Sequence, residues 1–117
     1  MSDSILRIRS KEFAKHIVFL CRQMKKSGVE NALVNQLLRS GTSVGANIHE
    51  AQYAQGTKDF ISKFEIALKE CNESEYWLEL LFETDSLTEA EFKKFQNKCI
   101  EIRRMLVSSI TTLKSKQ

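Results

Sequence analysis

The sequence predicts an all-α fold, an antiparallel up-down-up-down four-helix bundle formed by a single domain of residues 1–117. Three observations lead to this prediction. The chain has no proline and only four glycines, so the residues that most often interrupt helices are nearly missing. Apolar residues recur at helical spacing in four blocks. Only a few residues separate the blocks, and short connections make consecutive helices antiparallel neighbours.

The first block predicts a helix over residues 10–26. Its apolar residues follow the helical repeat, and they are Phe13, Ile17, Leu20, Cys21 and Met24. Ser10 is expected to cap the N-terminus, since a serine hydroxyl can accept a hydrogen bond from a free backbone N–H of the first turn. Ser27 and Gly28 are expected to end the helix.

The second block predicts a helix over residues 30–54, although part of it has the composition of a loop. Residues 39–52 read RSGTSVGANIHEAQ, with two glycines, two serines and a threonine. The apolar spacing that begins at Leu33 and Leu37 nevertheless continues through this stretch to Val44. A loop would give no reason for such continuity, so we expect one uninterrupted helix.

Gly41 and Gly45 inside this helix need an explanation, because each costs about 1 kcal/mol relative to alanine. The two glycines lie one turn apart on the flank of the core stripe, and small residues at this spacing let another backbone approach closely. A phosphate-binding loop is the alternative. The chain lacks the Walker spacing and its lysine, so we favour close helix packing.

The last two blocks predict helices over residues 58–84 and 89–114. Thr88 and Glu91 match the T-x-x-E pattern of a capping box at the start of the fourth helix. The core stripes of the two helices consist of Phe60, Phe64, Ala67, Leu68, Cys71, Leu78, Leu81 and Phe82 in the third, and Phe92, Phe95, Cys99, Ile102, Leu106, Ile110 and Leu113 in the fourth.

The sequence contains no recognisable catalytic, metal or cofactor site. Its three cysteines are far apart and form no C-x-x-C pair, so we expect small buried side chains rather than a disulfide framework or a zinc site. His16 and His49 are isolated, and the Glu-x-x-His motif of helical di-metal sites is missing. We therefore expect a non-enzymatic protein without a cofactor or small-molecule substrate.

Glu75 is the one acidic residue that projects to the edge of the predicted core. A buried carboxylate needs a partner. We expect a polar pair with Asn47, Ser40 or an arginine that fixes the helix register. A catalytic or metal-binding acid is the alternative.

Several apolar or small side chains project away from the predicted core, and such patches often mark interfaces. They are Phe19, Leu38, Thr42, Ala46, Tyr53, Ile66, Trp77 and Leu80. We expect the chain to self-associate through them, with Trp77 and Tyr53 as anchors. A contact that joins two different patches must close into a ring or continue as a filament.

Charge is distributed unevenly along the chain. Residues 1–39 carry eight basic and three acidic side chains, residues 58–91 three and ten, and residues 92–117 seven and one. The first and fourth helices are neighbours in an up-down bundle, so their outer faces could form one positive surface that binds RNA or DNA. Its candidate residues are Arg7, Arg9, Lys11, Lys15, Arg22, Lys94, Lys98, Arg103 and Arg104.

Such a surface is expected to bind with little sequence specificity, because no aromatic residue is predicted among the basic side chains for base stacking. The alternative is a solvated face, partly neutralised by the acidic third helix, on a protein-interaction scaffold with no nucleic-acid role. The sequence has no apolar stretch of membrane-spanning length and no signal-peptide pattern at MSDSILRIRSKEF. We therefore expect a cytoplasmic protein without membrane contact.

Two stretches together resemble a known family. Residues 37–52, LLRSGTSVGANIHEAQ, and residues 58–81, KDFISKFEIALKECNESEYWLELL, are similar to the four-helix bundle family of 23S rRNA intervening-sequence proteins. The likeness extends more loosely to the first helix, in SKEFAKHIV, and to the fourth. It implies a bacterial protein that assembles into a homopentameric ring. The family is also distantly similar in fold to the accessory variability determinant of diversity-generating retroelements, a basic protein that binds nucleic acid and partners a reverse transcriptase.

Overall fold

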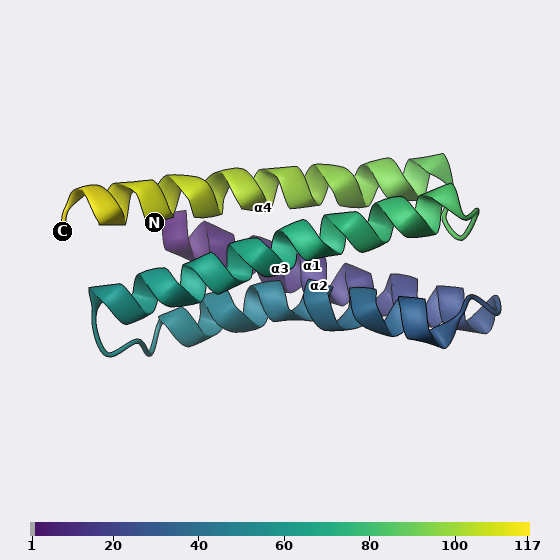
Figure 1. Ribbon diagram of the computed structural model, residues 1–117, viewed down its shortest axis with the longest axis horizontal. Helices are drawn as coiled ribbons and strands as arrows, with labels where there is room; N and C mark the ends of the chain where they lie inside the picture. Colours follow the sequence, from purple (N-terminus) through teal and green to yellow (C-terminus); the bar gives the residue numbers. More distant parts are fainter. Residues whose placement is uncertain (1) are drawn as a thin grey trace.

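The computed structural model describes residues 2–117 and their side chains from Ser4 onward. It contains four helices, α1 (Ser2–Lys26), α2 (Asn31–Ala51), α3 (Thr57–Glu83) and α4 (Glu89–Ser115), and no strand among the described residues. The helices form an antiparallel bundle that measures 48 × 22 × 19 Å (Figure 1). The predicted all-α four-helix bundle is therefore confirmed.

Each helix packs against two neighbours and lies diagonally across from the fourth. α1 contacts α2 and α4, and α3 contacts the same two helices from the opposite side (Figure 1). The beginning of α1 and the end of α4 lie at the same end of the bundle. α1 and α4 are thus adjacent, as the up-down topology requires, although they have the least contact of the four neighbouring pairs.

The start of α1 differs from the prediction, because the helix begins at Ser2 rather than near Ser10. Ser10 is buried inside the helix, and its hydroxyl donates a hydrogen bond to the Arg7 carbonyl 3.1 Å away. Leu6 explains the longer helix, since it is fully buried and lies two turns before Phe13 on the same core stripe. The prediction of Ser10 as a helix cap is wrong.

The other helix ends follow from local sequence signals. α1 ends at Lys26, just before Gly28, which has a φ of +87°. The Val29 and Gly28 N–H groups donate to the Met24 and Lys25 carbonyls. This pattern is a Schellman motif, in which glycine avoids the strain of a left-handed backbone. At the start of α4, the Thr88–Glu91 capping box is present, with both reciprocal hydrogen bonds.

α2 runs through both glycines without a break, and Figure 1 shows it as one continuous helix. It ends at Ala51, earlier than predicted, and Tyr53 and Ala54 continue as a turn. A Cβ atom at Gly45 would lie 3.2 Å from the backbone oxygen of Ser10, and one at Gly41 would lie 2.9 Å from Ile17 Cγ2. Both glycines therefore lie where α2 approaches α1 closely within the same chain.

The core is apolar and continuous along the bundle. The largest fully buried side chains come from all four helices, and full burial of each such group is worth about 1.5–3 kcal/mol. Three serines are also buried, and the Ser74 hydroxyl donates to that of Ser40 across 2.9 Å between α3 and α2. Cys21, Cys71 and Cys99 are buried free thiols, and burial raises the pKa of Cys21 to about 11.

Candidate nucleic-acid interface

Two of the nine predicted basic residues are held in ion pairs. Arg103 on α4 pairs with Glu75 on α3, which gives the core-edge carboxylate the arginine partner considered among its alternatives. Arg9 on α1 pairs with Glu101 on α4. Each pair raises the pKa of its arginine, and each offsets a charge that was expected to face a ligand. Arg103 and Arg9 therefore each bridge two neighbouring helices.

The remaining seven basic residues make no ion pair with any side chain that the structure describes. Six are exposed and Lys98 is half-buried; they are Arg7, Lys11, Lys15 and Arg22 on α1, and Lys94, Lys98 and Arg104 on α4. Because α1 and α4 are neighbours, these side chains give this pair of helices an excess of positive charge. We call these seven residues the basic surface.

The basic surface is most concentrated where α1 faces α4, around His16. Burial lowers the pKa of His16, and the positive charges of Lys98 and Lys94 lower it further. The His16 Nδ1 atom is buried and has no hydrogen-bond partner among the described residues. Burial thus favours the neutral imidazole most, and the nearby Lys98 and Lys94 add to this preference.

A small pocket lies beside His16 along the α1–α4 seam. It has a volume of about 290 Å³, and its lining consists of His16, Phe19, Leu20, Gln23, Glu91, Lys94 and Phe95. Glu91 is the one acidic group in this lining. Its two carboxylate oxygens accept hydrogen bonds from the Thr88 N–H and the Gln23 amide, at 2.9 and 3.1 Å. Glu91 is therefore already engaged within the protein.

Phe19 is an aromatic residue within the basic surface, contrary to the expectation that none would lie there. Its side chain is 62% exposed, and the Arg22 guanidinium carbon lies 5.9 Å from its ring centre. Lys15, Phe19 and Arg22 share one face of α1, because they are spaced by four and three positions. That spacing was readable from the sequence, where Phe19 was assigned to self-association instead.

Trp77 does not project outward as predicted. It is half-buried and packs against the core, and its indole N–H donates to Glu73 across 3.0 Å. Glu73 also pairs with Arg39 on α2, which reaches Glu70 as well. The hydrogen bond from Trp77 and then the Arg39 charge lower the pKa of Glu73. Trp77 thus belongs to a polar network that joins α2 to α3.

The other predicted interface residues are distributed over different parts of the surface. Leu38, Thr42 and Leu80 are half-buried, whereas Ala46, Tyr53 and Ile66 are exposed. The Thr42 hydroxyl donates to the Leu38 carbonyl at 2.7 Å, within α2. Tyr76, which was not predicted, is 57% exposed and contacts Trp77 edge-on, with 5.0 Å between ring centres.

A longer groove lies on the other side of α1, between α1 and α2. Its volume is about 980 Å³, and small side chains from both helices line it together with Arg7, Lys11 and His49. Gly45 and Ala46 are part of the lining, so the groove follows the line along which the two helices approach closely. Arg7 and Lys11 are consequently separated from the α1–α4 pocket by the body of α1.

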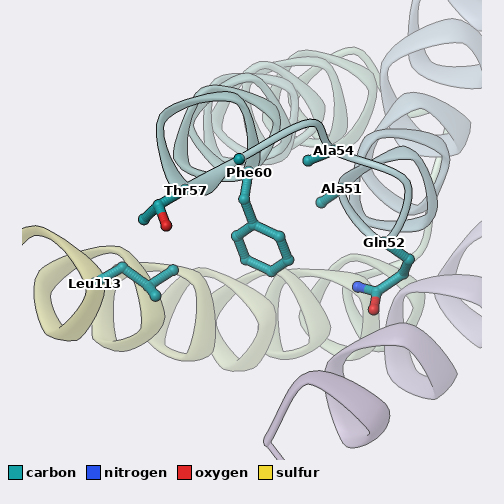
Figure 2. A pocket seen from close by; sticks show the side chains of 7 residues that line it. Ala51, Gln52, Ala54, Thr57, Phe60 and Leu113 are labelled. Carbon is teal, nitrogen blue, oxygen red and sulfur yellow. The ribbon is translucent and has the colours of Figure 1, made fainter.

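A third hollow lies at the end of the bundle near the α2–α3 connection. It has a volume of about 430 Å³. Figure 2 shows the Phe60 ring pointing from α3 toward α4, between Leu113 and Gln52. The lining of this hollow contains no charged side chain, so the hollow offers little to recognise a charged ligand.

Among the side chains of residues 4–117, no three His, Cys, Asp or Glu groups gather into a cluster that could hold a metal ion. None of the four described helices is both long and apolar enough to cross a membrane.

Comparison with known proteins relates this arrangement to a family. A sequence profile described as "23S rRNA-intervening sequence protein" matches residues 3–108. The chain belongs to this family. The match spans α1, α2, α3 and most of α4, so every residue of the basic surface of this intervening-sequence protein lies inside it.

A solved structure supports the same relationship. A protein of unknown function from the S23 ribosomal protein family of Bacteroides thetaiotaomicron VPI-5482, with a crystal structure at 1.70 Å resolution, is 46% identical to this intervening-sequence protein. The match covers 95% of this chain and 99% of that one, with a TM-score of 0.93. No curated protein matches the chain.

Proposed function

We propose that this intervening-sequence protein is a non-enzymatic, homo-oligomeric bundle of the bacterial cytoplasm that binds nucleic acid through its basic surface. The observation that supports this proposal is the set of seven basic side chains on α1 and α4 without an acidic partner among the described residues. Lys94 and Lys98 lie close enough to His16 to lower its pKa. Concentrated charge of one sign is what phosphate backbones bind.

The proposed binding is governed by charge, so it should weaken steeply as salt rises. Each phosphate contact releases counterions, and the logarithm of the binding constant falls linearly with the logarithm of salt concentration. Gel-shift titrations with mixed-sequence RNA and DNA over a salt series measure this slope. Replacing Lys94 and Lys98 with glutamate should make the slope shallower and weaken binding by about ten-fold or more.

The double variant Lys58→Glu, Lys69→Glu is the matched control, because it changes the net charge by the same amount at two exposed lysines on α3, away from the basic surface. It should leave both affinity and slope nearly unchanged. Equal losses in the control and in the α4 variant would show that only net charge matters. If the wild-type protein bound neither nucleic acid at low salt, the proposed function would be wrong.

The proposed oligomer is a homopentamer, in line with the family resemblance. Ile66 is 39% exposed and Tyr76 is 57% exposed on α3, and both lie outside the basic surface. Light scattering measures the assembly mass. Ile66→Glu should lower that mass while circular dichroism stays helical. Ile66 is a cleaner test than Trp77, because Trp77→Glu would also disturb the network with Glu73 and Arg39.

A protein-interaction scaffold is the second candidate function. It is favoured by the exposed Ile66 and Tyr76 on α3, a helix that also carries seven of the fifteen acidic residues of the chain. A protein partner held by apolar contacts should stay bound as salt rises. Co-purification from the host at low and high salt therefore separates this function from nucleic-acid binding.

A further inference from the structure

Phe19 is a large apolar side chain that the fold leaves in solvent among cations. It is 62% exposed, and its ring also lines the α1–α4 pocket that contains His16 and Lys94. Arg22 lies 5.9 Å from the ring centre on one side. A single exposed apolar residue is ordinary, but one that lies between Arg22 and a pocket lined by Lys94 suits a ligand that is both anionic and aromatic.

The charged surroundings argue against a protein partner at this position. The buried centres of protein interfaces are depleted of charged residues, and of lysine in particular. Docking an apolar protein surface on Phe19 would bring Lys15 and Lys94 toward that centre, at a desolvation cost. A nucleic acid avoids this desolvation cost, because its phosphates interact favourably with the lysines while a base can cover the phenyl ring.

We propose that Phe19 is a stacking platform for an unpaired base, so that the ligand of the basic surface is single-stranded nucleic acid. This inference rests on the proposed nucleic-acid binding and deepens it. Bases inside a duplex already stack on one another, whereas bases of a single strand expose a face that an aromatic side chain can cover. Lys15 and Arg22 on α1, with Lys94 and Lys98 on α4, contact the phosphates on either side.

The direct test measures fluorescence anisotropy of the full-length protein with two labelled ligands. One is a short mixed-sequence single strand, and the other is the duplex that it forms with its complement. The wild type should bind the single strand more tightly. Phe19→Ala should weaken single-strand binding on the order of ten-fold, the range found for base–aromatic stacking, and should leave duplex binding unchanged.

Two further substitutions at the same position separate stacking from apolar contact. Phe19→Leu keeps an apolar side chain but removes the aromatic face, so it should weaken single-strand binding as much as Phe19→Ala. Phe19→Trp keeps an aromatic face and should bind at least as tightly as the wild type. Tyr53→Ala removes an aromatic that is 76% exposed but lies outside the basic surface, and it should leave the preference for single strand over duplex unchanged.

The results that overturn this inference differ from those that overturn the proposed function. Equal affinity for single strand and duplex, or a Phe19→Leu variant that binds like the wild type, rejects stacking while leaving charge-based binding intact. A fall in assembly mass for Phe19→Ala, measured by light scattering, would assign Phe19 to self-association instead. Failure of the wild type to bind either ligand at low salt rejects both proposals.

Discussion

The two sides of α1 pack in opposite ways. Toward α2, Gly41 and Gly45 remove side chains from the interface, and a Cβ at Gly45 would lie 3.2 Å from the backbone oxygen of Ser10 on α1. Toward α4, contact is sparser and partly polar, through Arg9–Glu101 and a hydrogen bond from Gln23 to Glu91. The α2 side is thus joined by close backbone packing, whereas the α4 side is joined partly by polar contacts and has Lys94 in the lining of its pocket.

This difference shows how one helix can serve both stability and binding. Close backbone packing against α2 fixes α1 in place without help from charged groups. The α4 side can therefore hold like charges close together, as Lys94 and Lys98 around His16 demonstrate. Charges that repel one another reduce stability unless a ligand of opposite sign is present, so the α1–α4 side is the one suited to recognition.

The largest expected effect is on the α1–α2 side. Gly45→Leu would drive a branched side chain into the Ser10 carbonyl, which belongs to backbone and cannot rotate away. Such overpacking costs about 1–3 kcal/mol or more. Chemical denaturation should show this loss in the free energy of unfolding.

Gly56→Leu is the control for that experiment, because a Cβ at Gly56 would meet nothing within 4 Å and its φ of 166° is open to any residue. Gly56→Leu should lower the free energy of unfolding by distinctly less than Gly45→Leu does. Equal losses at the two glycines would mean that general chain effects, rather than close packing on α1, explain the result.

An intermediate effect is expected from pH on the α1–α4 side. The folded-state pKa of His16 is lowered by burial, Lys98 and Lys94, with Glu12 opposing and Lys15 adding to the effect. The unfolded chain therefore binds a proton more readily. The contribution of neutral His16 to the free energy of unfolding is therefore fully present above the unfolded-state pKa of about 6.5. It is lost as pH falls below that value toward the folded-state pKa.

Thermal melts of wild type and His16→Gln at neutral and mildly acidic pH measure this difference. The wild type should lose more stability on acidification than the variant. Glu73 titrates in a separate window, since its pKa is lowered from the ordinary glutamate range and its contribution is lost in stronger acid. Parallel pH profiles for the two proteins would exclude His16 as the titrating group.

The smallest expected effect is from the Arg9–Glu101 pair. Both side chains are more than two-fifths exposed, at 44% and 49%, and solvent screens exposed ion pairs so that they contribute little to stability. Arg9→Met should therefore leave the free energy of unfolding nearly unchanged. A loss as large as that of Gly45→Leu would contradict the contrast between the two sides of α1.

Much of the fold was predictable from the sequence because apolar spacing reports directly on which side of a helix is buried. The spacing through Val44 and the capping box at Thr88 placed α2 and the start of α4. The start of α1 was missed, since a serine typical of a helix cap also fits inside a helix when its hydroxyl bonds to a preceding carbonyl, as Ser10 does.

The candidate site was less predictable, because helical projection gives the direction of a side chain but not its reach. Arg39 reaches from α2 to Glu73 on α3, and Glu73 also accepts the hydrogen bond of the Trp77 indole. Trp77 therefore belongs to the contact between α2 and α3, whereas the prediction had it exposed. Arg9 and Arg103 likewise reach acids on neighbouring helices. Which charges stay unpaired depends on such distances between helices, and a single sequence does not contain them.

The buried cysteines have a practical consequence for following the motions of this bundle. Cys21, Cys71 and Cys99 lie on α1, α3 and α4, and none is exposed. A thiol reacts with alkylating agents as the thiolate, and a pKa of about 11 makes that form scarce at Cys21. Alkylation must therefore wait for local opening, so mass spectrometry of the three modified peptides would time the opening of three helices separately in the unmutated protein.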